Sequence, residues 1–146
     1  MISKLFTNGA MQSVERLVEF TGARHKVLTN NIANFETPFY RARELDPAMF
    51  QAGLRDAIET RRRSGASPIN GPLKMRNSRQ VHYRDGGSAS FTPGFDDSGI
   101  MFHDRTNADI ERTMQHLAEN TMAHNAGLQI LKNEFDMLKM AIRGRV

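Results

Sequence analysis

Metal binding and catalysis in proteins depend chiefly on histidine, cysteine and carboxylate side chains. The chain has five histidines and no cysteine. On a helix that binds a metal, ligands are spaced so that they share one face, and no carboxylate or cysteine cluster completes such a set here. None of the five histidines has a partner at this spacing; they are His25, His82, His103, His116 and His124. We therefore expect no metal site and no cofactor.

Catalytic groups are equally sparse. Asp96 and Asp97 are adjacent, so their side chains point in different directions and favour loop acids over a catalytic pair. Gly86 and Gly87 precede a polar loop rather than a helix, which argues against a phosphate-binding loop. No serine lies in a nucleophile elbow. We expect no enzyme, and a cell-wall-cleaving activity is disfavoured because a convincing acid pair is lacking.

Composition limits the fold. Hydrophobic residues make up 39% of the 146 residues and tryptophan is absent, so we expect an elongated protein rather than one with a large compact core. Nowhere do about twenty apolar residues run together, and the N-terminus lacks the apolar region of a signal peptide. The sequence thus predicts no transmembrane segment and no cleaved signal. Disulfides are excluded because there is no cysteine.

Positive charge is concentrated in the middle of the chain. The formal net charge is +4, yet eight basic residues lie between Arg55 and Arg84 against only Asp56 and Glu59. This pattern leaves two interpretations, a basic helical nucleic-acid-binding protein or a solvated arginine-rich loop. The loop is favoured because Tyr83 is the only aromatic residue in the basic stretch.

Any functional groups must be positioned by helices, and the C-terminal run supplies the longest. Apolar residues there repeat at alternating steps of four and three, a heptad seam that requires a partner. The capping-box pair Thr106 and Asp109 starts the helix and Gly144 ends it. A second stripe, Ala123, Ala126, Ile130, Met137 and Ala141, predicts contact with other subunits. The seam comprises Ile110, Met114, Leu117, Thr121, His124, Leu128, Leu131, Phe135, Leu138 and Ile142.

A second heptad seam lies near the N-terminus and stops before Pro38. Leu17, Phe20 and Val27 widen it beyond what one partner helix would cover. Its members are Met11, Val14, Val18, Thr21, His25, Leu28, Ile32 and Phe35. The two seams together predict an antiparallel coiled-coil hairpin.

Pairing the seams places their polar residues in two adjacent layers. Thr21 falls opposite His124 and His25 opposite Thr121, so a hydroxyl and an imidazole meet in each layer and set the register. The alternative is that each histidine reaches solvent. The apolar pairs in the same register are Met11 with Phe135, Val14 with Leu131, Val18 with Leu128, Leu28 with Leu117, Ile32 with Met114 and Phe35 with Ile110.

Between the seams the chain is irregular. Asp46 followed by Pro47 predicts a helix start, with the helix running to about Thr60. Glycine, proline and serine punctuate residues 64–99, where we expect mobility and a hairpin built from Leu73–Met75 and Val81–Tyr83. The predicted fold is mainly α, with an irregular, partly β or disordered middle. It divides into the N-terminal core helix (1–35), the turn, short helix and basic segment (36–106), and the C-terminal core helix (107–146).

The turn after the first seam identifies a family. Asn31, Ile32, Ala33 and Asn34, followed by Thr37, Pro38 and Tyr40, resemble the N-terminal signature of the bacterial flagellar rod and hook family. The C-terminal run from Asn107 is similar to that of proximal-rod members. Phe39 stands where the family usually has glycine, which predicts that the turn needs no positive φ there. Physically, the asparagines end the helix, Thr37 and Pro38 force an extended exit, and Tyr40 folds back on the helix end.

The resemblance implies a structural role without turnover. It implies a torque-transmitting subunit of the basal-body rod that spans the periplasm, exported unfolded by the flagellar type III apparatus without a cleaved signal. Implied partners are other rod proteins, the ring-to-rod adaptor and the inner-membrane ring, in a hetero-oligomeric helical tube. No nucleic acid is expected as a partner on this interpretation.

Overall fold

The computed structural model describes residues 9–63, 73–84, 89–96 and 110–144. Helix α2 (Gly9–Ala33) leads through a turn into strand β1 (Arg43–Glu44) and helix α3 (Pro47–Arg63). Strands β2 (Val81–Tyr83), β3 (Ala89–Phe91) and β4 (Gly94–Phe95) follow, and helix α4 (Ile110–Ile142) closes the order. The mainly helical class predicted from the heptad patterns is confirmed.

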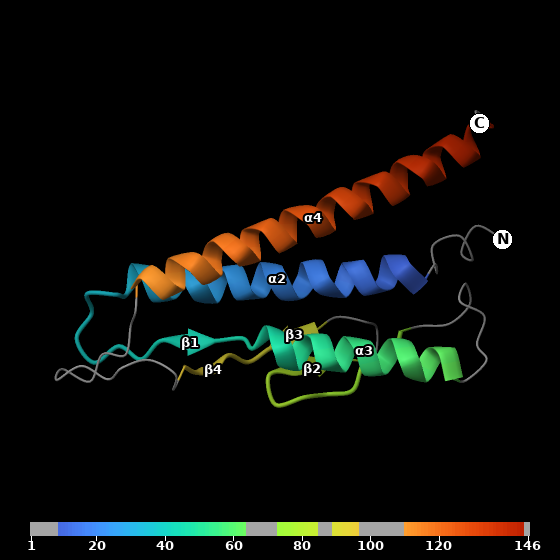
Figure 1. The fold of residues 1–146 in the computed structure, drawn as a ribbon. Coiled ribbons are helices and arrows are strands. Elements are labelled where there is room, and N and C mark those ends of the chain that lie inside the picture. The colour runs from blue at the N-terminus through green and yellow to red at the C-terminus, as the bar shows by residue number, and fades with distance from the viewer. Residues whose placement is uncertain (1–8, 64–72, 85–88, 97–109, 145–146) are drawn as a thin grey trace.

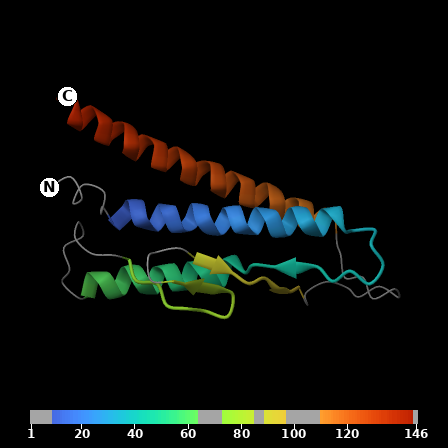
Figure 2. The same ribbon diagram turned by 180° about the vertical axis from the view of Figure 1, so that it is seen from behind.

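The elements form three layers (Figure 1). Helix α2 lies in the middle, α4 covers one side of it, and α3 with the strands covers the other, as the reverse view also shows (Figure 2). This arrangement explains why α2 has more apolar surface than one helix can cover. Both faces of α2 are occupied within the same chain.

Helices α2 and α4 run antiparallel and are in contact, but their axes diverge along part of their length. They lie close where α2 ends and α4 begins, and α4 then rises away from α2 toward its C-terminal end (Figures 1 and 2). The antiparallel hairpin therefore has a packed half and a splayed half. A regular coiled coil over the full seam is not seen.

The hydrophobic core lies between α2 and the middle segment. Phe20, Leu45, Phe50 and Val81 form a buried cluster. The rings of Phe20 and Phe50 stack with centroids 4.2 Å apart and planes 7° apart. Because these residues come from α2, the link between β1 and α3, α3 and β2, the middle segment is an integral part of the core.

The middle helix begins as predicted. The amide of Ala48 donates to Asp46 Oδ1 at 2.8 Å, the N-cap interaction expected before Pro47. The helix continues to Arg63, three residues past the predicted end at Thr60, because Arg61–Arg63 are good helix formers placed beside the negative end of the helix dipole. Gly144, with φ of +64°, follows α4 as the predicted stop.

The small sheets differ from the predicted hairpin. Strand β2 pairs antiparallel with β3, with Val81 opposite Phe91, and not with Leu73–Met75, which form no strand. Strand β1 pairs with β4, with Arg43 opposite Phe95. The mobility expected for residues 64–99 falls partly on 64–72, 85–88 and 97–99, outside the described residues, as does the capping box at Thr106 and Asp109.

Candidate assembly site

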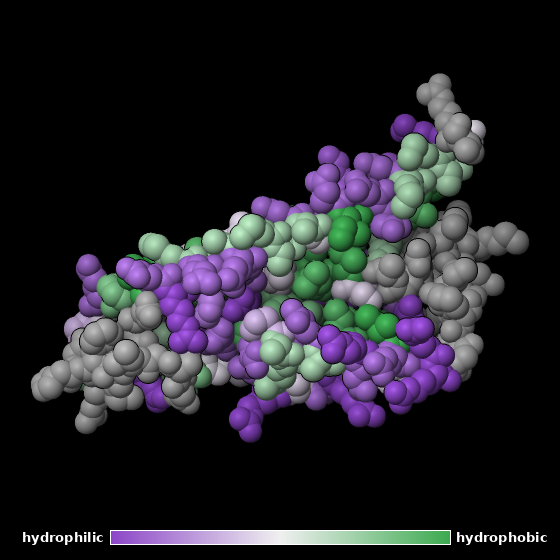
Figure 3. All heavy atoms as spheres, viewed as in Figure 1, coloured by the Kyte–Doolittle hydropathy of each residue, from purple (hydrophilic) through white to green (hydrophobic). Residues whose placement is uncertain are grey.

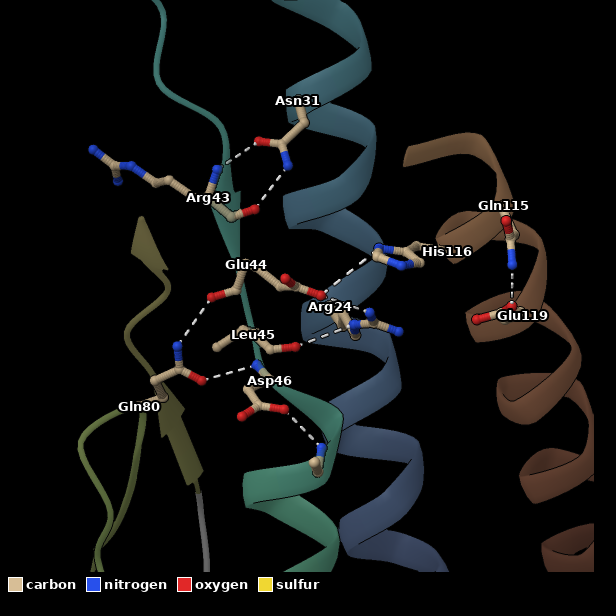
Figure 4. Close-up of polar contacts among 11 residues, drawn as sticks. Arg24, Asn31, Arg43, Glu44, Leu45, Asp46, Gln80, Gln115, His116 and Glu119 are labelled. Atoms are coloured by element: carbon tan, nitrogen blue, oxygen red, sulfur yellow. Dashed lines mark hydrogen bonds and ion pairs between the residues drawn. The ribbon is translucent and has the colours of Figure 1, made fainter. Parts of the chain in front are cut away.

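The turn after α2 is fastened to the helix by a side-chain amide. Asn31, only 5% exposed, donates from Nδ2 to the Arg43 carbonyl at 2.7 Å and accepts the Arg43 amide on Oδ1 at 3.1 Å. Figure 4 shows this pair of bonds reaching from α2 to β1. Asn31 thus acts as a neighbouring strand would, satisfying both backbone groups of one residue. It bonds the backbone of Arg43, twelve residues away, rather than its own.

Tyr40 and Asn34 complete the turn. The Tyr40 hydroxyl donates to Asn31 Oδ1 at 2.9 Å, and Asn34 Nδ2 donates to the Asn30 carbonyl at the end of α2 at 2.8 Å. Burial raises the pKa of Tyr40 from its ordinary value, although the charge of Arg43 and a hydrogen bond from Asn30 oppose the shift. Tyr40 therefore stays protonated and keeps its donor. Asn34 and Tyr40 thus bond to the end of α2, whereas the extended exit predicted at Thr37 and Pro38 is not found, because the Tyr40 amide donates to the Thr37 carbonyl at 3.2 Å in a turn.

Phe39 corrects one prediction. Its φ is +61°, in the left-handed region, so the turn does require a positive φ at this position. The glycine usual in the family would adopt this conformation without strain, whereas a residue with a Cβ adopts it at a cost. The phenyl ring is 73% exposed, so burial within the chain does not offset that cost.

Three further side chains reach the segment after the turn. Arg24, only 6% exposed, donates from Nε to the Leu45 carbonyl at 3.1 Å and from Nη2 to Glu44 Oε1 at 2.9 Å. Gln80 accepts the Asp46 amide at 2.9 Å and donates to the Glu44 carbonyl at 3.1 Å. His116 of α4 lies 3.7 Å from the same Glu44 oxygen (Figure 4). Side chains of α2, α4 and the segment before β2 thus converge on residues 43–46.

In the packed half of the helix pair, Thr21 and His124 lie opposite each other as predicted. The residues of α4 that contact α2 beside them differ from the predicted seam. Thr21 Oγ1 lies 2.8 Å from His124 Nδ1, as the heptad pairing predicts. Beside it, Asn120 is buried and donates to the Thr21 carbonyl at 2.9 Å. One turn further, a Cβ on buried Gly127 would lie 2.8 Å from Val18 Cγ2. Gly127 therefore allows the two backbones to approach closely.

The second predicted polar layer is not formed. His25 is exposed, and the Thr121 hydroxyl donates to the Leu117 carbonyl of its own helix at 2.7 Å. The α2-facing positions of α4 include Asn120 and Gly127, each one residue before a predicted seam member. Hydrophobicity favoured Leu128 in the sequence, but close packing selects the small residue beside it.

The predicted residues divide by burial. Met11, Thr21, Leu28 and Asn31 are buried. Those of intermediate burial are Val14, Val18, Ile32, Asn34, Phe35, Tyr40, Ile110, Leu117, Thr121, His124, Leu131 and Leu138. The exposed members are His25, Ala33, Thr37, Pro38, Met114, Leu128, Phe135 and Ile142.

The splayed half of α4 exposes apolar side chains on more than one face. Leu128, Ile130, Phe135, Met137 and Ile142 are between 41% and 68% exposed. All five residues of the second predicted stripe are exposed as well. Figure 3 shows hydrophobic residues gathered between α4 and the layer below it. Exposed apolar surface of this extent is typical of a protein–protein contact.

Sequence reasoning missed Arg24, Glu44, Gln80, Asn120 and Gly127. Arg24 carried one usable signal, since it occupies the same helical stripe as Phe20, Leu28 and Asn31, where a charged residue must be paired. Gly127 also carried a usable signal in the sequence, because a glycine inside a helix often marks a close approach of two backbones. Glu44, Gln80 and Asn120 had no local signal, since their partners are distant in sequence.

Within the described ranges, no three histidine, aspartate or glutamate side chains are grouped so as to hold a metal ion. Over the same ranges, no helix combines the length and apolarity needed to span a bilayer.

Known proteins resemble the chain along most of its length. It is 32% identical over 122 residues to flagellar basal body rod protein FlgB of Cereibacter sphaeroides, covering 83% of this chain and 84% of the relative. Proteins of the same name from Bacillus subtilis and Aquifex aeolicus are 27% and 26% identical, over 94% and 90% of this chain and 95% and 90% of theirs. No family model matches the chain.

Proposed function

Because this chain belongs to the family of flagellar basal body rod protein FlgB, we propose that it builds the proximal rod and transmits torque by helix packing with neighbouring rod subunits. As a member of that family it is a structural component of the flagellar basal body rod and not an enzyme. The nucleic-acid-binding alternative is not favoured, since the named relatives are rod proteins.

One observation carries the packing proposal, the exposed apolar surface of the splayed half of α4. Ile130 and Met137, seven residues apart on one face, are 47% and 53% exposed. Burying such side chains contributes roughly 1.5 to 3 kcal/mol each. Packing of neighbouring subunits on this half of α4 would bury these side chains and so stabilise the assembly. The divergence of α4 from α2 leaves space for that packing.

The other parts of the chain take complementary roles in this proposal. The N-terminal segment 1–35 and the C-terminal segment 107–146 form the tube-lining core through their seams, and 36–106 contacts adjacent subunits. The signature residues Asn31, Ile32, Ala33, Asn34, Thr37, Pro38 and Tyr40 fix where the middle segment leaves the core. The Asn31 clamp on Arg43 supports this role.

The proposed partners follow from the family. They are the other rod proteins, the ring-to-rod adaptor and the inner-membrane ring, arranged as a helical tube across the periplasm. We propose export by the flagellar type III apparatus in an unfolded state, without a cleaved signal. Heterologous contacts, in which different surfaces of successive subunits meet, produce such an open tube.

The test changes the exposed face without touching the α2 contact. Ile130→Asp together with Met137→Asp should abolish rods and swimming when the gene replaces its deleted counterpart in a motile host. Gln129→Asp with Asn133→Asp, on the same half of α4, is the matched control and should leave both normal. Electron microscopy of purified basal bodies and swimming in soft agar give the measurements. Normal rods in the Ile130 and Met137 variant would refute the proposal.

A further inference from the structure

Methionine supplies all the sulfur in the chain, which has nine methionines and no cysteine. Four of the methionines lie in α4, and each is between 52% and 66% exposed, although methionine is a residue type that proteins usually bury. Met11 of α2, by contrast, is 3% exposed. The methionines of α4 are therefore open to small reagents in solution, whereas Met11 is shielded from them.

Three of these methionines belong to the exposed apolar face of α4. Met137 follows Ile130 by seven residues, about two turns, and so lies on the same side of the helix. Met140, three residues after Met137, lies beside it. Met122 is in line with Met140, because the eighteen residues between them make about five full turns. We call Met122, Met137 and Met140 the face methionines.

The face methionines are separate from the hydrophobic core. Within the described ranges, neither the buried cluster around Phe20 nor the side chains packed against it include any residue of α4. A change of polarity at the face methionines thus alters a surface and leaves the core as it is. Its effect falls on whatever packs against α4.

We propose that the face methionines are oxidation sites through which a peroxide converts the assembly face of α4 from apolar to polar. The thioether sulfur attacks one peroxide oxygen and the O–O bond breaks. The sulfur is oxidised by two electrons to the sulfoxide, and the remaining hydroxide takes the proton and leaves as water. The reaction needs access to sulfur, which the free subunit provides and packing in a rod would remove.

Oxidation at these positions opposes assembly for a definite physical reason. A thioether packs as a flexible apolar group, whereas a sulfoxide carries a strongly polar oxygen that must be desolvated when a neighbouring subunit covers it. Sulfoxide reductases reverse the change, so the block is reversible. The inference rests on the proposed function, in which neighbouring subunits pack on this face, and it adds a regulation of the same face.

Peroxide mapping of the purified full-length chain tests the sites themselves. Trypsin cleaves after Lys132 and Lys139, so mass spectrometry measures Met137 and Met140 in separate peptides. In dilute hydrogen peroxide, Met11 should react more than about tenfold more slowly than either, because its sulfur becomes accessible only when α2 opens locally. Circular dichroism should show unchanged helix after the face methionines have reacted. Equal rates, or loss of helix at that stage, would overturn the proposal.

Glutamine variants test the consequence in the motile deletion host. Met122→Gln with Met137→Gln and Met140→Gln imitates the polarity and length of three sulfoxides, and rods and swimming should be lost. Leucine at the same positions keeps the face apolar and should restore both. Met49→Gln, at an exposed methionine of α3, is the control and should leave rods normal.

Two results would contradict the role of polarity. Normal rods in the triple glutamine variant would overturn the proposal, and so would loss of rods in the leucine variant. The Ile130→Asp and Met137→Asp variant separates this failure from that of the proposed function. If that variant has no rods while the glutamine variant has normal ones, the packing face stands and only its regulation by oxidation fails.

Discussion

The clamp at Asn31 makes a sharp prediction about stability. Asn31→Asp keeps the size of the side chain but replaces the amide donor with an oxygen. That oxygen would face the Arg43 carbonyl, which Asn31 Nδ2 now approaches at 2.7 Å in a site 5% exposed. The bonds accepted from the Arg43 amide and the Tyr40 hydroxyl are retained. The variant therefore removes one donor and places a negative charge beside the Arg43 carbonyl.

The magnitude follows from that geometry. Loss of one hydrogen bond and of the partner of a buried carbonyl should lower the free energy of unfolding by about 2 to 4 kcal/mol. Urea unfolding followed by circular dichroism measures it. The defect should shrink as the pH falls, because a protonated carboxyl regains a donor for the carbonyl.

Asn30→Asp is the matched control. Asn30 is the preceding residue, is exposed, and donates only a 3.3 Å bond to the Tyr40 hydroxyl. Its substitution should change the free energy of unfolding by less than about 0.5 kcal/mol. If Asn31→Asp and Asn30→Asp were equally stable, Asn31 would not be the fastening point of the turn.

Two further predictions concern the helix pair and the half-buried Tyr83. Gly127→Ala should destabilise the chain by about 1 to 3 kcal/mol in urea unfolding, because its Cβ would lie 2.8 Å from Val18 Cγ2. Gly22→Ala, whose Cβ would lie 3.7 Å from His124 Cε1, should be tolerated, and equal losses would contradict the close approach. Burial raises the pKa of Tyr83 to about 12, although the charge of Arg16 lowers it and that of Glu19 raises it. Because an unfolded tyrosine titrates near 10, the stabilisation is complete below about pH 10 and is lost as the pH rises toward 12. Tyr83→Phe should flatten the alkaline decline in unfolding free energy measured across that window, and an unchanged decline would exclude this role for Tyr83.

The sequence supported those parts of the fold that depend on local pattern. Helical periodicity predicted the two long helices, and Asp46 with Pro47 predicted the start of α3. The level of Thr21 against His124 followed from pairing two seams. Each of these inferences uses residues within one helix or a simple match between two helices.

What the sequence did not predict depends on contacts between distant or unlike groups. The Phe20 core joins α2, α3, β2 and the link before α3, which no single periodicity describes. Asn120 and Gly127 face α2 in place of the predicted seam residues Thr121 and Leu128. A hydrogen bond from Asn120 and the close approach of the two backbones at Gly127, rather than hydrophobicity, determine which residues face α2. The positive φ of Phe39 was missed because a bulky residue seldom adopts it.

The sequence separation of the contacts predicts an order of folding. The clamps that fasten the turn join residues 12, 20 and 34 positions apart, whereas the Thr21–His124 contact closes a separation of 103. Short loops cost less entropy to close, so we expect the turn and its core to form before α4 docks. No described member of the buried cluster belongs to α4. A subunit emerging unfolded would thus complete its core first and keep its last helix available for whichever neighbour it meets.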